Sequence, residues 1–256
     1  MDPLNTSQDD KRDTHFGFRR VGETEKASMV ADVFRSVAAR YDLMNDLMSL
    51  GSHRRWKDFA VGQSGIREGH RVLDVAAGSG DLARRFAQRV GSSGRVFVTD
   101  INPAMLQQGR NRLLDAGFVA TISYAIADAE RLAFTPGYFD CVSIGFGLRN
   151  VTRIDRALAS MFEMLRPGGR IVVLEFSHPT TKALASIYDA FSFALIPRLG
   201  KVVTGDAGSY QYLVESIRRH PDQATLSSLM MEAGFEDVRY FNLSGGIVAL
   251  HIGFRY

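Results

Sequence analysis

Short apolar runs alternate with amphipathic stretches between residues 71 and 176. The runs are rich in β-branched residues, which is typical of strands buried on both faces of a parallel sheet. They lie at Arg71–Val75, Arg95–Thr99, Ala120–Ala127, Phe139–Gly145 and Arg170–Phe176. Between them, helical patterns occupy Asp81–Val90, a segment that begins at Pro103, and Arg153–Leu165. Strands and helices in alternation predict a doubly wound α/β core.

The pattern changes after residue 176. Three helical segments are predicted next, at Lys182–Leu199, Tyr210–Arg219 and Gln223–Ala233. Val238–Leu243 and Ile247–Phe254 then flank a Ser-Gly-Gly turn, which predicts an antiparallel hairpin. Added to the core, this terminal hairpin gives a seven-stranded sheet.

The chain before the core has a different character. Residues 1–14 are polar and charged without periodicity, so we expect a disordered tail. Glu23–Arg40 carries apolar residues at helical spacing and predicts an amphipathic helix. We expect one domain over residues 15–256, with residues 15–65 as an N-terminal helical lid and residues 178–222 as a helical insertion over the substrate site.

Composition narrows the class of protein. The chain has 256 residues, 45% of them hydrophobic, one cysteine and a net charge of +3. A lone cysteine gives no disulfide framework and indicates a reducing compartment. The basic residues are too few and too scattered for a nucleic-acid footprint. The acidic N-terminus is unlike a signal peptide, and no apolar run approaches the ~20 residues that span a bilayer. We expect a cytoplasmic protein, soluble or peripheral to a membrane.

The most informative stretch is Val72–Asp81, where an apolar strand breaks into a glycine turn and then a helix. Gly78 and Gly80 permit backbone angles that side chains forbid, so the chain turns sharply and a ligand can approach its main chain. Asp81 in the first helical turn suits the positive end of the helix dipole. Doubly wound domains hold nucleotide-like cofactors at such turns.

Three acids at the ends of successive strands favour S-adenosylmethionine over a nicotinamide cofactor. Asp100 lies 20 residues after Gly80, which suits both cofactors. Asp74 would repel a diphosphate but hold the cationic aminoacyl end of S-adenosylmethionine. Asp128 and Ala129 follow the third strand, where a carboxylate can accept a hydrogen bond from the adenine amino group. The chain has no Tyr-x-x-x-Lys pair for hydride transfer. The structural alternative is a tight turn with surface carboxylates.

Several longer motifs are far more specific than the turn. They are His15–Phe18, Tyr41–Asp46, Phe146–Asn150, Leu174–Ser177, Tyr212–Ile217 and His220–Gln223. With these motifs, nearly the whole chain from His15 to Tyr256 resembles the ubiquinone/menaquinone biosynthesis C-methyltransferases. The resemblance implies a class I methyltransferase domain that uses S-adenosylmethionine to methylate a ring carbon of a polyprenylated quinol, demethylmenaquinol or a 2-methoxy-6-polyprenyl-1,4-benzoquinol.

The resemblance also carries residue roles. It implies cofactor contacts at Ser79, Asp100, Asp128 and Ala129. Ala77 stands where glycine is common, and Ser79 keeps the hydroxyl of a common threonine. Gly145 stands where many members have a serine that contacts the cofactor, so that contact is either missing or made by the main chain.

Carbon methylation of a quinol needs positive charge or a donor near the developing phenolate, and a base for the proton. Arg149 and Asn150 follow the fourth strand of the core, where they would face the ligand crevice. Arginine rarely gives up its proton, so we assign Arg149 an electrostatic role and Asn150 an orienting one. In the structural alternative, Asn150 or Thr152 caps the next helix and Arg149 is solvated.

Tyr41, Asp42 and Asn45 precede the core and could fold over the substrate. The ring of Tyr41 would attract the sulphonium, since aromatic faces attract cations. The alternative is a satisfied polar turn between helices. The histidines show no paired spacing of metal ligands, so no metal is predicted.

The aromatic segment Lys182–Leu199 suggests a partner. Tyr188, Phe191, Phe193 and Ile196 could line a groove for a polyprenyl tail, with Arg198 and Lys201 near an anionic membrane surface. The alternative is an ordinary core helix. A homodimer or a quinone-biosynthesis assembly is also compatible with the sequence.

Three rival functions remain open on the sequence. The chain could methylate another phenol or a lipid. It could be a non-catalytic member of a quinone-biosynthesis assembly that keeps the cofactor pocket as a scaffold. A nicotinamide oxidoreductase is the most distant alternative.

Overall fold

The central element is a mixed seven-stranded sheet in a computed structural model that describes residues 13–37, 46, 49, 51–190, 192 and 207–256. Five parallel strands come in the spatial order β5 (Ile122–Ile126), β4 (Arg95–Asp100), β3 (Arg71–Val75), β6 (Phe139–Gly145) and β7 (Leu165–Phe176). Beside β7, β9 (Val248–Phe254) and the edge strand β8 (Glu236–Leu243) form the antiparallel hairpin. The predicted seven strands and terminal hairpin are confirmed.

The chain reverses its direction of travel across the sheet between β3 and β6. It runs from β3 outward to β5, then returns to place β6 on the other side of β3. In open α/β sheets, ligands bind at the carboxyl ends of the strands beside such a reversal. The glycine turn after β3 and the segment after β6 therefore flank the expected ligand crevice.

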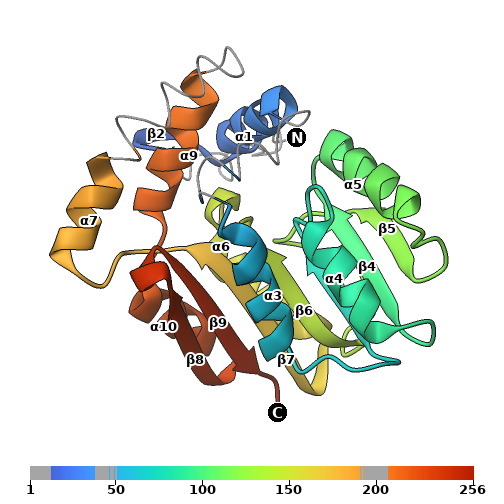
Figure 1. Cartoon of the computed structure of the whole chain (residues 1–256). Helices are drawn as coiled ribbons and strands as arrows, with labels where there is room; N and C mark the ends of the chain where they lie inside the picture. Colours follow the sequence, from blue (N-terminus) through green and yellow to red (C-terminus); the bar gives the residue numbers. More distant parts are fainter. Residues whose placement is uncertain (1–12, 38–45, 47–48, 50, 191, 193–206) are drawn as a thin grey trace, which may run out of the picture.

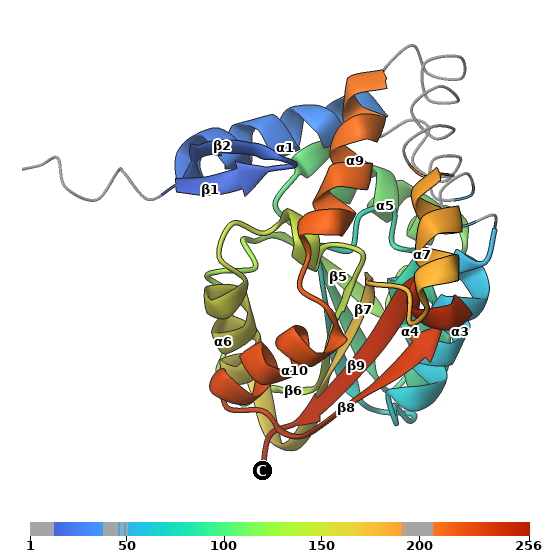
Figure 2. The ribbon, with the colours of Figure 1, turned by 90° about the vertical axis from the view of Figure 1, so that its left-hand side faces the viewer.

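Helices cover both faces of the sheet, as Figures 1 and 2 show. One face is covered by α3 (His53–Gln63), α4 (Asp81–Val90) and α5 (Pro103–Asp115), and the other by α6 (Ile154–Met164) and α10 (Gln223–Glu232). Alternate side chains of the central strands supply the two cores. For example, Val72 packs among the first group and Leu73 among the second, both fully buried.

A third layer lies beyond the carboxyl ends of the parallel strands (Figure 2). It contains α1 (Glu23–Val37), α9 (Ala207–Arg219) and a two-stranded hairpin of β1 (Asp13–Phe16) and β2 (Arg19–Gly22). The shorter α7 (Lys182–Asp189) lies beside α9.

The hairpin corrects two predictions. Asp13 and Thr14 belong to a strand, so the predicted tail is too long, and the segment from residue 15 to residue 22 is β structure and not helix. Gly17 makes the turn with a φ of 57°, and Asp13 pairs with Arg20 across the hairpin at 2.7 Å. Residues 1–12 lie outside the described part of the chain.

Other boundaries differ by a few residues. The last core strand begins at Leu165 because the chain keeps pairing through the Pro-Gly-Gly sequence, where the Gly168 amide donates to the Arg255 carbonyl (2.6 Å). The structure describes α7, Ala190 and Ser192 of the predicted helix Lys182–Leu199. It describes α1 of the predicted helix Glu23–Arg40.

Candidate active site

The turn between β3 and α4 is built from three residues with positive φ. Ala76, Gly78 and Gly80 have φ values of 50°, 55° and 75°. The turn is closed by a hydrogen bond from the Gly80 amide to the Ala77 carbonyl (3.0 Å). Helix α5 comes so close that a Cβ on its Gly109 would lie 2.5 Å from the Gly78 carbonyl oxygen. Gly109 is thus a determinant of the turn that periodicity alone does not reveal.

Asp74 lies at the end of β3 with only 1% of its surface exposed. Its Oδ1 accepts a hydrogen bond from the Ser143 hydroxyl at 2.6 Å. Its Oδ2 has no hydrogen-bond partner among the described residues. Burial raises the pKa of the Asp74 carboxyl to about 7, although the Ser143 hydrogen bond, the Lys57 charge and the Ala83 amide lower it. A buried carboxylate oxygen without a donor is poised for a cationic or hydrogen-bonding ligand.

A small cavity of about 20 Å³ adjoins this carboxylate. It has room for a group about the size of a water molecule or an ammonium. Its walls come from α3, β3, the glycine turn, α4 and the end of β6. They are formed by Lys57, Asp74, Ala77, Ser79, Asp81, Leu82, Gly145 and Phe146.

Lys57 is a buried lysine that our sequence reasoning missed. Its Nζ donates to Asp81 Oδ2 at 2.9 Å and lies 6.0 Å from the centre of the Phe146 ring. Burial raises the pKa of Asp81, but the Lys57 and Arg85 cations outweigh it and lower this pKa to about 2. A signal was present in the sequence, since Lys57 is one turn before Val61 on the apolar side of α3.

Asp100 ties the turn to the start of α5. Its Oδ2 accepts from the Gly78 amide and its Oδ1 from the Asn102 amide, each at 2.9 Å. Burial raises the pKa of Asp100, which is 8% exposed. The Ile101 amide is a third donor, and an ionised carboxylate has about four acceptor positions, so about one remains for a ligand hydroxyl group.

Asp128 and Ala129 lie just beyond the end of the next strand, β5. The Asp128 side chain is exposed, and its Oδ1 accepts from the Glu130 amide at 2.9 Å, while Ala129 is 7% exposed. The Ala127 amide donates to the Asp100 carbonyl (3.2 Å), which joins this segment to β4. The six predicted cofactor residues thus lie at or just beyond the ends of three neighbouring strands. Gly78 and the buried Ser79 belong to the turn after β3.

Arg149 is buried, and not solvated as the structural alternative required. It sits in a short 3₁₀ helix, η2 (Leu148–Asn150), directly after β6. Its Nη1 donates to Glu175 Oε1 at 2.7 Å and to the Phe146 carbonyl at 2.6 Å. The Arg149 side chain is 1% exposed and that of Glu175 2%. The guanidinium of Arg149, a group that can donate two parallel hydrogen bonds, is therefore held in place at the edge of the sheet where the parallel strands end.

Asn150 does not cap the next helix. Helix α6 begins at Ile154, and neither Asn150 nor Thr152 is its N-cap, which is Arg153. Asn150 Oδ1 instead accepts a hydrogen bond from the Tyr212 hydroxyl of α9 at 3.1 Å. Phe16 of β1 stacks on the Tyr212 ring at 4.0 Å, so the hairpin supports this contact.

Tyr41, with Asp42 and Asn45, lies outside the described residues. Glu175 and Tyr212 belong to two of the specific sequence motifs, but the sequence alone assigns them no role. An acid inside the otherwise apolar strand Arg170–Phe176 was a usable signal, because a buried charge requires a partner. Within the described residues, no group of three or more His, Cys, Asp or Glu side chains is arranged to hold a metal ion.

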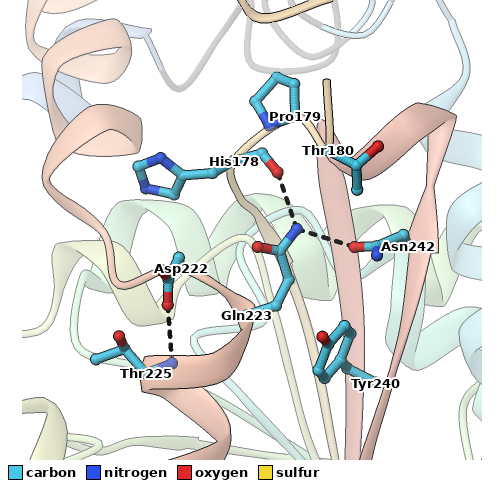
Figure 3. Close-up of a pocket in the computed structure, with 8 residues that line it drawn as sticks. All are labelled: His178, Pro179, Thr180, Asp222, Gln223, Thr225, Tyr240 and Asn242. Carbon is cyan, nitrogen blue, oxygen red and sulfur yellow. Dashed lines mark hydrogen bonds between the residues drawn. The ribbon is translucent and has the colours of Figure 1, made fainter. Parts of the chain in front are cut away.

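A separate polar pocket of about 430 Å³ lies between the end of β7, the start of α10 and β8 (Figure 3). Gln223 crosses it and donates from Nε2 to the His178 carbonyl and to Asn242 Oδ1, both at 2.9 Å. Asp222 Oδ1 accepts from the Thr225 amide at 2.8 Å as the N-cap of α10. None of the predicted site residues lines this pocket.

Solved structures with the same fold are methyltransferases. A SAM-dependent methyltransferase from Aquifex aeolicus matches with a TM-score of 0.61 and 13% identity over 83% of this chain and 98% of its own. Phosphoethanolamine N-methyltransferase 2 of Haemonchus contortus, in complex with S-adenosyl-L-methionine, matches with a TM-score of 0.57 and 16% identity over 78% of this chain and 52% of its own. The chain has the class I S-adenosylmethionine-dependent methyltransferase fold.

Sequence comparison gives the family. Residues 20–255 match the model of the ubiE/COQ5 methyltransferase family. The chain is 57% identical over 247 residues to the ubiquinone/menaquinone biosynthesis C-methyltransferase UbiE of Yersinia enterocolitica, covering 96% of this chain and 98% of that protein. The corresponding protein of Erwinia tasmaniensis is 56% identical over 250 residues, covering 98% and 100%. The chain belongs to the ubiE/COQ5 methyltransferase family and is an S-adenosylmethionine-dependent C-methyltransferase.

No helix in the described ranges has both the length and the apolar character needed to cross a bilayer.

Proposed function

We propose that this enzyme methylates a ring carbon of a polyprenylated quinol, either demethylmenaquinol, a 2-methoxy-6-polyprenyl-1,4-benzoquinol, or both. The relatives that are 56–57% identical over nearly the whole chain carry the name of ubiquinone/menaquinone biosynthesis C-methyltransferases. The observation that carries the proposal is the buried Arg149–Glu175 pair directly after β6, beside the cofactor turn.

We infer that S-adenosylmethionine is held by Asp74, Gly78, Ser79, Asp100, Asp128 and Ala129. The orphaned Asp74 Oδ2 suits the cationic amino group, and the remaining acceptor position of Asp100 suits a ribose hydroxyl. Lys57, which lines the same cavity as Asp74, is the cation suited to the carboxylate of the cofactor's amino acid part. Bound there, S-adenosylmethionine supplies an electrophilic methyl group.

Arg149 has the properties needed to stabilise a phenolate as it forms. Glu175 and the Phe146 carbonyl fix its guanidinium, so little reorganisation is needed when charge develops nearby. The low dielectric of a buried site strengthens that interaction. Arginine stays protonated and is a poor base, which leaves proton removal to water or another group. Asn150, oriented by Tyr212, is suited to position a ring oxygen.

Tyr41 is proposed to complete the site from the N-terminal side. Its ring would lie against the sulphonium, where an aromatic face favours a cation. The motif that contains it lies outside the described residues, so this role rests on the resemblance and on the residue type.

The decisive experiment is transfer of a labelled methyl group to short-tailed versions of the two quinols, followed by mass spectrometry. We expect product with the wild type and at least a hundredfold lower kcat with Arg149→Ala, since one preorganised donor contributes about that factor. Arg153→Gln is the matched control, because Arg153 is a half-buried arginine four residues away that pairs with Asp155 and Glu23. Absence of product on both quinols, with S-adenosylhomocysteine still bound, would refute the proposed acceptors.

Peripheral membrane contact is proposed as the route to a lipid-like substrate. Its support is the aromatic segment that begins with α7, where Ile187 is 68% exposed while Tyr188 is buried. Phe191, Phe193, Ile196, Arg198 and Lys201 lie outside the described residues. Flotation with anionic liposomes should recover the protein with the vesicles, and recovery only in the unbound fraction, with and without quinol, would exclude this route. We also propose a cytoplasmic location, and assembly either as a homodimer or with other proteins of quinone biosynthesis.

A further inference from the structure

Another cavity, of about 160 Å³, lies between the β1–β2 hairpin, α1, α9 and the segment that leads into α6. Five of its lining residues carry basic side chains, His15, Lys26, Arg149, Arg219 and His220, and none of the lining residues is acidic. We call it the basic cavity. It is several times larger than the ~30 Å³ share of one water molecule, so it admits a small ligand.

His220 forms part of the floor of the basic cavity. It is 4% exposed, and neither nitrogen of its ring has a hydrogen-bond partner among the described residues. The titratable groups that act on it are Arg149, His178 and His251. Burial, with help from these groups, lowers the pKa of His220 to about 3, so the free ring is neutral and offers one N–H donor. A buried imidazole without partners is costly unless a ligand satisfies it.

Lys26 is a second buried group at the basic cavity. It lies in the first turn of α1, where the helix dipole disfavours positive charge. Its Nζ donates to the Val151 carbonyl at 2.8 Å, which uses one of three protons. Burial lowers the pKa of Lys26 to about 8, although Glu130 raises it. At pH 7 the Lys26 amine is still largely protonated, so it places a positive charge at the wall of the basic cavity.

Exposed basic side chains mark the mouth of the basic cavity. Arg219 is exposed at the end of α9, where the helix dipole favours a cation. The dipole thus explains a cation at Arg219 but not one at Lys26. His15 is exposed on the hairpin. Its pKa is lowered by partial burial and by the charges of Arg219, Arg20 and Lys26, while the charge of Asp13 raises it. Acids such as Asp13 and Glu130 lie nearby, but none of them lines the basic cavity.

We propose that the basic cavity binds a phosphate group. Donors converge from three elements, with Lys26 from α1, Arg219 from α9 and His15 from the hairpin, which suits a tetrahedral oxyanion better than a planar carboxylate. The hydroxyls of Thr14 and Thr152 also line the cavity. Arg149 also borders the cavity, but its guanidinium is already paired with Glu175. It therefore contributes positive electrostatic potential and is not offered as a direct hydrogen-bond donor to the phosphate. Phosphate binding here does not depend on which quinol is the acceptor, and Arg149 and Tyr212 of the proposed quinol site also line the basic cavity.

The phosphate group can belong to free phosphate or to a phospholipid headgroup, and both are tested on the full chain. Inorganic phosphate is titrated by calorimetry at low ionic strength, and vesicles of phosphatidylcholine with or without phosphatidic acid are tested by co-sedimentation. We expect saturable binding of at least one probe. Binding to phosphatidic acid vesicles alone would assign the site to a headgroup, and binding of inorganic phosphate would assign it to a soluble phosphate.

Two variants decide whether the binding occurs in the basic cavity. Arg219→Gln removes an exposed cation, and Lys26→Met keeps the apolar stem of the buried lysine. Each should weaken binding at least tenfold. Arg67→Gln, which removes an exposed arginine before the amino end of β3, should bind as the wild type does. Affinity for S-adenosylhomocysteine checks that each variant is folded. Equal binding by all three variants, or no saturable binding of either probe, would overturn the proposal.

Discussion

We expect the carboxyl of Asp74 to link the stability of the fold to the binding of the cofactor. Its pKa in the folded protein is raised to about 7 from an ordinary value of 3.8. The folded state therefore binds this proton more tightly than the unfolded state. The stabilising effect is fully present below pH 3.8, declines as pH rises and is lost above about pH 7. The ionised form that would bind a cationic cofactor is the form that destabilises the unliganded protein.

Asp74→Asn should separate these two effects. At pH 8 the unliganded variant should be more stable than the wild type by roughly 1–3 kcal/mol, because a buried charge is replaced by a neutral amide. Its affinity for S-adenosylmethionine should fall at least tenfold. Urea unfolding at pH 5 and pH 8 and calorimetric titration of the cofactor measure both. An unchanged pH dependence of stability in the variant would contradict this assignment of Asp74.

Lys57 is expected to recognise the amino acid part of the cofactor. Lys57→Met should weaken S-adenosylhomocysteine at least tenfold and leave 5′-methylthioadenosine, which lacks the amino and carboxyl groups, within about twofold. Calorimetry with both ligands makes the comparison. Arg54→Gln is the control on the same helix, since Arg54 is exposed and pairs with Asp46 at 2.9 Å. Equal losses for both ligands would indicate a general collapse of the turn.

At the level of elements, the close approach of α5 to the glycine turn positions the site. A methyl group at Gly109 would meet the Gly78 carbonyl at 2.5 Å, and backbone cannot rotate away as a side chain can. Gly109→Ala should therefore destabilise the protein by about 1–3 kcal/mol and weaken cofactor binding. Thermal unfolding with and without S-adenosylhomocysteine measures both effects.

Gly62→Ala provides the matched control for this substitution. Gly62 lies within α3, and a Cβ there would meet nothing within 4 Å. Alanine should then stabilise the helix by about 0.5–1 kcal/mol, with unchanged cofactor affinity. A neutral Gly109→Ala would show that α5 can move away from the turn at little cost.

The sequence predicts elements best where one pattern extends over many residues. The buried strands of the core and the amphipathic α4 have an unambiguous period, so their positions and the sheet agree with prediction. The β1–β2 hairpin was missed because each strand has only four residues and mixes charges with few apolar positions. Its pairing and the stack of Phe16 on Tyr212 depend on a helix almost 200 residues away.

Site residues divide in the same manner. The grouping of Asp74, Asp100 and Asp128 at one edge could be predicted because strand ends in a doubly wound sheet share that edge, so position along the chain implies position in space. Lys57, Glu175 and Tyr212 depend on contacts between elements that are remote in sequence. Periodicity identifies which face of an element is buried, but not which partner a buried polar group meets there.

At the scale of the whole molecule, Cys141 offers a direct measure of how the parts cooperate. It is the only cysteine in the chain and lies on the central strand β6, with no exposed surface. Burial raises the pKa of its thiol far above the ordinary value, so the native protein should react negligibly with a thiol reagent. Labelling therefore requires opening of the sheet itself.

The cofactor should slow this labelling by stabilising the whole domain. A ligand at 100 times its dissociation constant stabilises the folded state by about 2.7 kcal/mol, which corresponds to about hundredfold slower labelling when reclosing is faster than the chemical step. S-adenosylhomocysteine should give this protection in the wild type, and Asp74→Asn should lose most of it at the same ligand concentration. Mass spectrometry of the labelled chain gives the rates. If the ligand protects Cys141 much less than it raises the free energy of global unfolding, β6 opens in a smaller unit than the cofactor site, and the sheet and the site do not unfold together.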